Sequence, residues 1–268
     1  MKPTVDYALV TGATSGIGYE LAKLLARDGH NLILTARNEA DLERVKTEFE
    51  SFGVAVQNFP ADLSVKGNAA DLCNRIREQG LNVSVLVNDA GQGLYGQFKD
   101  TDLERELAMI ELNISSLVVL TKFFLREMLQ AEGGRILNLA SIASKLPGPW
   151  QSVYHGTKAF VLSFSEAIRE ELKGTGVTVT ALMPGPTDTA FFEQAEMLDS
   201  KMLQDESALS DAADVAKDGY EAMMAGKDKV ISGLKNKMQV GMSNFMPDST
   251  VAHAMNEQQK PVERKDDK

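Results

Sequence analysis

The chain has 268 residues, of which 43% are hydrophobic and 25% charged, a balance typical of globular proteins. A formal net charge of −10 argues against the basic surface that nucleic-acid binding needs. Cys73 is the single cysteine, which excludes an intramolecular disulfide framework, and we expect a cytoplasmic protein without signal peptide or membrane span.

Short apolar runs alternate with amphipathic stretches along the first 232 residues. The apolar runs predict buried strands at residues 8–11, 31–36, 54–59, 83–88, 135–141, 177–183 and 229–233. The amphipathic stretches predict helices that begin at Ile17 and then cover residues 40–52, 66–79, 103–131 and 152–174. This alternation predicts one α/β domain, a Rossmann-type doubly wound parallel sheet of about seven strands with helices on both faces.

Three segments depart from this alternation. Residues 190–210 interrupt it near the carboxyl ends of the strands, where we expect a lid over a substrate. Residues 234–246 predict a weakly amphipathic surface or oligomer segment. We expect the domain to cover residues 1–255, and the charged residues 256–268 to be a disordered tail.

A glycine-rich turn, TGATSGIG at residues 11–18, follows the first strand. Gly12 can adopt the backbone angles of a tight turn, and Gly16 and Gly18 leave room for a pyrophosphate to approach the backbone. The N-terminus of the next helix offers free N–H groups and a partial positive charge to a phosphate. The spacing differs from GxGxxG, so by itself the turn fits either a dinucleotide site or a plain strand-to-helix connection.

The end of the second strand bears on which dinucleotide would bind. A cofactor with a free ribose 2′-hydroxyl is usually held by an acidic residue near this position, but Ala36 is neutral and Arg37 is cationic. Arginine can bind a phosphate through two hydrogen bonds, so Arg37 predicts NADP(H). Without the upstream glycines, a surface arginine at a strand end would be the simpler interpretation.

Tyr154 and Lys158 lie four residues apart on a predicted helix, which places both side chains on one face. A nearby ammonium lowers the pKa of a tyrosine, and such a tyrosine can pass a proton to a carbonyl oxygen. Ser141 ends the fifth strand at the same sheet edge and can hydrogen-bond that oxygen. Tyrosine and lysine at this spacing are also common on helix surfaces, and the serine favours the catalytic interpretation.

Several motifs together resemble the classical short-chain dehydrogenase/reductase family over roughly residues 5–232. They are TGATSGIG (11–18), NDAG (88–91), LNIS (112–115), Ser141, YHGTK (154–158) and PGPTDT (184–189). The resemblance implies an NADP(H)-dependent oxidoreductase that interconverts a carbonyl and an alcohol. It also implies a homodimer or homotetramer that pairs the helices near 102–131 and 152–174.

The resemblance implies four catalytic residues. Asn113 would hold a water of the proton relay, and Ser141 would orient the substrate carbonyl. Tyr154 would be the general acid in reduction and the general base in oxidation, and Lys158 would tune Tyr154 and bind the nicotinamide ribose.

The cofactor-binding residues implied by the resemblance lie on the loops after the strands. In chain order they are Gly12, Thr14, Ser15, Gly16, Ile17, Gly18, Arg37, Asp62, Leu63, Asn88, Ala90, Gly91, Tyr154, Lys158, Pro184, Gly185, Thr187 and Thr189. The family often has asparagine where this chain has Asp89, and some NADP-preferring members have a basic residue in place of Ser15. The NADP(H) prediction therefore depends mainly on Arg37.

The histidines and methionines give no clear sign of a further functional site. The three histidines show no metal-ligand spacing, so no catalytic metal is predicted, and His155 is expected to point away from Tyr154. Methionines crowd the last third of the chain and predict either core and lid packing or a plastic apolar pocket. Phe191, Phe192, Met197 and Leu198 would contribute to that pocket.

Two other function classes compete with an oxidoreductase. A non-catalytic protein that senses NADP(H) could use the same fold, but it has no need for Asn113, Ser141, Tyr154 and Lys158 together. A sugar-nucleotide epimerase shares the Tyr–Lys spacing, but the glycine spacing and the lack of a substantial C-terminal substrate domain disfavour it. The sequence does not identify the substrate.

Overall fold

A computed structural model describes residues 6–204, 209–243 and 245–262. Its sheet has seven strands in the order β3-β2-β1-β4-β5-β6-β7, and every neighbouring pair is parallel. The strands are β1 (Asp6–Thr11), β2 (Asn31–Thr35), β3 (Val56–Asn58), β4 (Asn82–Asn88), β5 (Gly134–Leu139), β6 (Val177–Met183) and β7 (Lys229–Ile231). The predicted doubly wound parallel sheet is confirmed, and its strand order reverses direction between β1 and β4, where such folds bind ligands.

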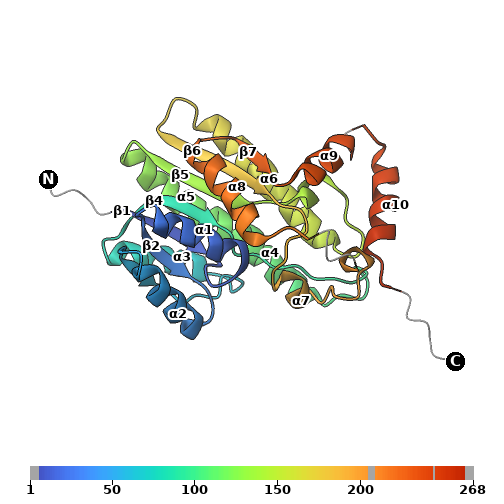
Figure 1. Ribbon diagram of the computed structural model, residues 1–268, viewed down its shortest axis with the longest axis horizontal. Coiled ribbons are helices and arrows are strands. Elements are labelled where there is room, and N and C mark those ends of the chain that lie inside the picture. The colour runs from blue at the N-terminus through green and yellow to red at the C-terminus, as the bar shows by residue number, and fades with distance from the viewer. Residues whose placement is uncertain (1–5, 205–208, 244, 263–268) are drawn as a thin grey trace.

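Helices cover both faces of the sheet (Figure 1). One face carries α1 (Gly16–Arg27), α2 (Glu39–Glu50) and α8 (Ala212–Met224), and we call the apolar layer beneath them the α1/α8 core. The opposite face carries α3 (Asn68–Glu78), α5 (Leu117–Gln130) and α6 (Ser152–Glu171) over the α5/α6 core. Successive strand residues alternate between these cores, which is why the strands are almost continuously apolar.

A buried polar network ties the sheet to α5 and α6. Asn88 at the end of β4 donates to Thr121 Oγ1 on α5 at 3.0 Å and to Asn138 Oδ1 on β5 at 2.9 Å. Asn138 donates in turn to Ser165 Oγ on α6 at 2.9 Å. Buried polar groups that are paired in this way fix one relative placement of the elements that carry them.

The predicted helix 103–131 is divided into three segments. They are α4 (Leu103–Ile110), a π-helical turn η1 (Glu111–Ser116) and α5. By length and composition the whole stretch Leu103–Gln130 could cross a membrane. Leu120, Phe124 and Met128 are instead buried in the α5/α6 core, as expected for a core helix.

The shorter elements gather near the carboxyl ends of the strands. They are η2 (Ile142–Lys145), α7 (Phe191–Gln194), η3 (Lys201–Leu203), α9 (Leu234–Ser243) and α10 (Asp248–Gln259). Figure 1 shows α9 and α10 at the same end of the molecule as α7.

The C-terminal segment is more ordered than the sequence predicts. Disorder was expected from residue 256, but α10 continues to Gln259, whose side chain is buried. Trp150 Nε1 donates to Asn256 Oδ1 at 3.0 Å, and the hydroxyl of Tyr95 donates to the Gln259 carbonyl. These tertiary bonds hold residues that composition alone assigns to a tail, while 263–268 lie outside the described residues.

Candidate active site

A cavity of about 1430 Å³ opens at the carboxyl ends of the strands. Most of the predicted cofactor-binding residues line it: Gly12, Thr14, Ser15, Gly16, Ile17, Arg37, Asp62, Leu63, Ala90, Gly91, Tyr154, Lys158, Pro184, Gly185, Thr187 and Thr189. One part of the wall is formed by the glycine-rich turn and the loops after β2, β3 and β4. The other part is mainly apolar and is formed by α7, α9, α10 and the loop after β5.

The glycine-rich turn has the shape that a pyrophosphate requires. Gly12 and Gly16 have φ angles of 70° and 58°, a region that favours glycine. A Cβ at Gly16 would lie 3.0 Å from Thr189 Cγ2, so the turn and the loop after β6 approach closely only without a side chain there. Ser15 precedes α1 without capping it through its side chain, so the first N–H groups of α1 are available to a phosphate.

Thr11 holds the turn next to the loop after β4. Its Oγ1 accepts from the backbone N–H groups of Asp89 and Ala90, each at 3.0 Å. Gly18 lies behind the turn and does not line the cavity, since a Cβ there would collide with the Asp89 carboxylate and the Gly12 carbonyl. These glycines therefore form a cradle that fits the dinucleotide cofactor of such folds, with Gly18 serving the packing beneath it.

Two arginines lie at the far end of the turn. Arg37 is exposed at the cavity wall, as the 2′-phosphate prediction requires. Arg44 on α2 was not predicted, although it also lines the cavity and donates from Nη2 to the Thr14 carbonyl at 3.3 Å. Asn38 accepts from the N–H groups of Ala40 and Asp41, and this cap starts α2 at an angle that directs its first turns toward the cavity.

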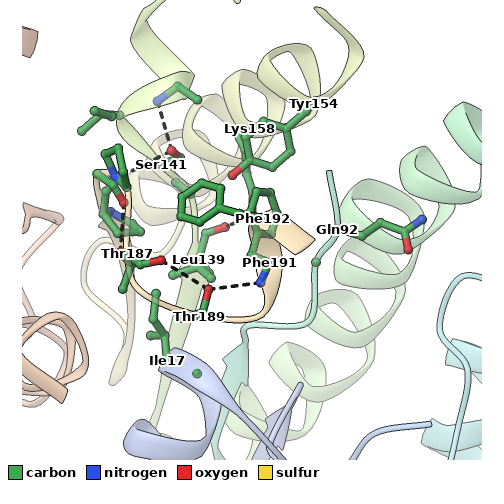
Figure 2. A pocket seen from close by; sticks show the side chains of 18 of the residues that line it. Ile17, Gln92, Leu139, Ser141, Tyr154, Lys158, Thr187, Thr189, Phe191 and Phe192 are labelled. Atoms are coloured by element: carbon green, nitrogen blue, oxygen red, sulfur yellow. Dashed lines mark hydrogen bonds between the residues drawn. The ribbon is translucent and has the colours of Figure 1, made fainter. Parts of the chain in front are cut away.

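Ser141, Tyr154 and Lys158 come together where the polar and apolar parts of the wall meet. Figure 2 shows Ser141, Tyr154 and Lys158 around the same cavity as Phe191. Lys158 Nζ lies 5.9 Å from the centroid of the Tyr154 ring and donates to the Leu139 carbonyl at 2.7 Å. Ser141 caps η2, because its Oγ accepts from the Ala143 N–H at 3.1 Å. The arrangement places a hydroxyl, a phenol and an ammonium around one point.

The pKa of Tyr154 shifts in the opposite direction to the one that the sequence predicts. Burial raises the pKa of Tyr154 to about 12, and a side-chain hydrogen bond with Ser141 opposes that rise. Burial lowers the pKa of Lys158 to about 8, and the carboxylate of Asp89 opposes that fall. The net shift of the Tyr154 pKa is therefore upward and not downward as expected, because burial outweighs the interactions that lower it. At pH 7 the phenol is protonated and the ammonium is charged.

Asn88 and Asn113 do not line the cavity. The Asn88 amide is used by the network to Thr121 and Asn138, which corrects the prediction that it packs against the adenosine. Asn113, in the π-helical turn, donates to the Gln92 carbonyl at 2.9 Å and to Thr157 Oγ1 at 3.0 Å. Both amide hydrogens of Asn113 are thus engaged, and its side chain braces the loop after β4 and α6.

Asp89 is the departure from the family pattern that has the clearest physical consequence. Its carboxylate lies beneath Gly12 and Gly18, and burial raises the pKa of Asp89 to about 7 although Lys158 opposes the rise. Its Oδ1 has no hydrogen-bond partner among the described residues. An ionised carboxylate at this position is therefore costly at neutral pH.

We expect Asp89→Asn to stabilise the protein progressively as pH rises from 4 to 7. In that window the folded protein keeps a proton on Asp89 that the unfolded chain has released, so the free energy of unfolding falls as pH rises. The neutral amide removes this dependence, a difference on the order of 2–4 kcal/mol by pH 7. Urea unfolding of the wild-type protein and the variant, both without cofactor, at about pH 5, 6 and 7 measures this difference in the free energy of unfolding. If the free energies of the two proteins changed in parallel with pH, the prediction would be contradicted.

The apolar wall differs in detail from the predicted pocket. Phe191 and Phe192 line it, whereas Met197 is fully buried in a cluster with Phe192 and Ala195, and Leu198 is 61% exposed. The wall also includes Leu146, Met202, Met238, Met242, Val251 and Met255. The segment predicted as a surface or oligomer segment, α9, thus supplies part of the cavity wall, and residues of α7 and η3 from the stretch 190–210 also line the cavity.

His155 also lies differently from the prediction. It was expected to point away from Tyr154, but the two ring centroids lie 5.9 Å apart in an edge contact and both rings line the cavity. Its Nδ1 lies 2.7 Å from the Leu146 carbonyl. Among the described residues, no group of three histidine, cysteine or acidic side chains could hold a metal ion.

Comparison with known proteins identifies relatives over most of the chain. The sequence profile of the short chain dehydrogenase family matches residues 6–198. An uncharacterized oxidoreductase from Staphylococcus epidermidis is 33% identical over 197 residues, which are 74% of this chain and 84% of the relative.

Solved structures share the fold over most of their length. A short-chain dehydrogenase from Sphingobium yanoikuyae in complex with NADPH is 27% identical with a TM-score of 0.79, and the match covers 90% of this chain and 96% of that one. The bulky-bulky ketone specific alcohol dehydrogenase from Comamonas testosteroni is 25% identical with a TM-score of 0.75, covering 90% and 93%.

Proposed function

The chain belongs to the short chain dehydrogenase family, and we propose that it is an NADP(H)-dependent oxidoreductase that interconverts a bulky apolar ketone or aldehyde and its alcohol. One observation carries the proposal. Ser141, Tyr154 and Lys158 line one cavity between a pyrophosphate cradle and an apolar wall. A carbonyl group placed there would lie within the same cavity as the proton donor Tyr154 and the residues that would hold the cofactor.

The residues divide the work of reduction among them. When bound, NADP(H) supplies the hydride that reaches the carbonyl carbon. Tyr154, protonated because burial raises its pKa to about 12, donates its phenolic proton to the carbonyl oxygen. Ser141 Oγ, held at the start of η2, hydrogen-bonds the same oxygen.

Lys158 stabilises the charge that Tyr154 acquires. Its ammonium lies beneath the Tyr154 ring and is anchored to the Leu139 carbonyl at 2.7 Å. A charge in so buried a place acts through a low dielectric, which strengthens its effect on a developing phenolate. Oxidation of the alcohol reverses these proton transfers, with Tyr154 as the base.

The choice of NADP(H) is supported by the two arginines at the adenosine end. Arg37 and Arg44 line the cavity on either side of the start of α2, and Ala36 offers no acid to a ribose 2′-hydroxyl. The Asp41 carboxylate lines the same region and would repel a 2′-phosphate. The preference for NADP(H) therefore requires that the attraction of the two guanidinium groups is stronger than this repulsion. The similar short-chain dehydrogenase that was solved with NADPH is consistent with this choice.

The substrate class follows from the apolar wall. Phe191, Phe192, Met242 and Met255 give it aromatic and flexible thioether surface, which suits a large apolar body. The similar alcohol dehydrogenase is specific for bulky-bulky ketones. We propose cytoplasmic reduction by a homodimer or homotetramer, for which exposed Leu107 and Phe160 on α4 and α6 offer contact surface.

The proposed function is tested by NADPH oxidation with a panel of aldehydes, apolar ketones, ketoacyl thioesters and ketosteroids, and with NADH as the comparison. Turnover of an apolar ketone with NADPH is the expected result. Tight NADPH binding with no turnover of any panel member would instead favour the NADP(H)-sensing alternative. Faster turnover with NADH would contradict the cofactor choice while leaving the reaction class intact.

A further inference from the structure

Two buried amide side chains at the cavity have unsatisfied polar atoms. Gln151 and Gln259 are 4% and 1% exposed, and both line the cavity. Nε2 of Gln151 and Oε1 of Gln259 have no hydrogen-bond partner among the described residues. A buried donor or acceptor without a partner costs about 1–3 kcal/mol, so two of them in one cavity wall point to a ligand that pairs with them.

The orientation of the Gln259 amide follows from His155. His155 Nδ1 lies 2.7 Å from the Leu146 carbonyl, which can only accept, so Nδ1 carries the proton. Burial lowers the pKa of His155, so the ring is neutral and its Nε2 is an acceptor. Gln259 Nε2 lies 3.3 Å from that nitrogen and donates to it, which leaves Gln259 Oε1 as a free acceptor.

Hydrogen bonds hold the main chain that carries each amide. The main-chain carbonyl of Gln259 accepts from the hydroxyl of Tyr95 and from Ser200 Oγ. Gln151 precedes α6 and its main-chain carbonyl accepts from the His155 N–H at 3.0 Å, so the main chain of Gln151 and the side chain of Gln259 both contact His155. Trp150, next to Gln151, has a φ of 69°, a strained angle for a tryptophan that its bond to Asn256 and its stacking on Tyr95 maintain.

We propose that Gln151 and Gln259 form a polar subsite for a hydroxyl group that the substrate carries remote from its reacting carbonyl. A hydroxyl can accept from Gln151 Nε2 and donate to Gln259 Oε1, whereas a carbonyl can only accept and would satisfy Gln151 alone. The surrounding Leu146, Val251 and Met255 are apolar. Building on the proposed function, the substrate class is a bulky apolar hydroxyketone.

The test compares ketones that differ only in the remote hydroxyl. The probes are 4-cyclohexylbutan-2-one and 4-(4-hydroxycyclohexyl)butan-2-one, with homologues that place one or two further methylenes between ring and ketone. We expect kcat/KM with NADPH to favour the hydroxyketone by about tenfold or more at one of these separations, because a site built to bond a hydroxyl rejects the analogue that lacks it. A kcat/KM ratio near one at every separation would overturn the proposal, and water would then be the hydrogen-bond partner of the two amides.

Variants link the preference to the two amides. Gln151→Leu and Gln259→Leu are each expected to bring the hydroxyketone-to-ketone ratio close to one. Gln130→Leu, the same change at an exposed glutamine at the end of α5 that does not line the cavity, is the matched control and keeps the ratio of the wild-type protein. An unchanged ratio in both Gln151→Leu and Gln259→Leu would overturn the proposal.

A binding measurement separates this proposal from the proposed reaction. Trp150 is the only tryptophan in the chain and lies beside the subsite, so its emission reports occupancy. The probes are titrated into the wild-type protein in the presence of NADP⁺. Tighter binding of a hydroxyketone without turnover would support the subsite and contradict the reaction, while turnover with equal binding and equal kcat/KM would support the reaction and overturn the subsite.

Discussion

Replacing Tyr154 with phenylalanine is expected to lower kcat for ketone reduction by about 10²–10⁴-fold, the range that a positioned proton donor contributes. The change removes only the hydroxyl. The ring keeps its contacts with Phe191 and His155, whose centroids lie 5.2 Å and 5.9 Å away. The Kd for NADPH should therefore change little, and single-turnover kinetics with saturating NADPH measures the chemical step directly.

The control for this variant is Tyr220→Phe. The Tyr220 hydroxyl donates to Asp28 at the protein surface and neither residue lines the cavity, so its loss should leave kcat unchanged. Activity of Tyr154→Phe within about threefold of the wild-type value would assign the proton transfer to another group, since so small a change corresponds to less than 1 kcal/mol of barrier. His155 would not be that group, because its Nδ1 proton is held by the Leu146 carbonyl.

The sheet and the position of the site could be predicted because they follow from periodicity. Buried parallel strands must be apolar on both faces, and the loops at their carboxyl ends must then meet along one edge. Gly12 follows β1 and Ser141 follows β5, more than 100 residues later, so the topology places these two at one sheet edge; Tyr154 reaches the same cavity from α6, the helix after β5.

The role of Asn88 was missed although the sequence contained a usable signal. Leu86, two residues earlier in β4, faces the α5/α6 core, and side chains two residues apart in a strand point to the same face. Asn88 therefore had to point toward α5 and away from the cofactor. The family resemblance implied a cofactor contact for Asn88, whereas the alternation along β4 indicates the core.

Other features depend on contacts that no local pattern encodes. The stretch 103–131 contains no glycine or proline that would mark its π-helical turn, so Asn113 looked like part of a regular helix. His155 and Gln259 are 104 residues apart, and the order of α10 depends on Trp150 and Tyr95. Charged composition predicts disorder, but a few buried tertiary bonds outweigh it here.

Replacing Arg37 with aspartate is expected to raise the Kd for NADPH by about 10–100-fold, because hydrogen bonds to a charged group contribute about 1.5–3 kcal/mol and a like charge replaces them. The Kd for NADH should stay the same or fall, since a carboxylate at this position can accept from both ribose hydroxyls. Isothermal titration with both cofactors measures the inversion.

Salt and a matched control identify the mechanism of this change. Arg37 is exposed, and salt screens the attraction between exposed charges. The difference between the Kd values for NADPH and NADH should therefore shrink as ionic strength rises from about 0.05 to about 0.5 M. Arg27→Asp makes the same charge change at the opposite end of α1, where Arg27 stacks over Phe52, and should not alter the preference. Equal weakening of NADPH and NADH by Arg37→Asp would contradict a 2′-phosphate contact, and Arg44, already anchored to the Thr14 carbonyl, would then be the guanidinium that selects the cofactor.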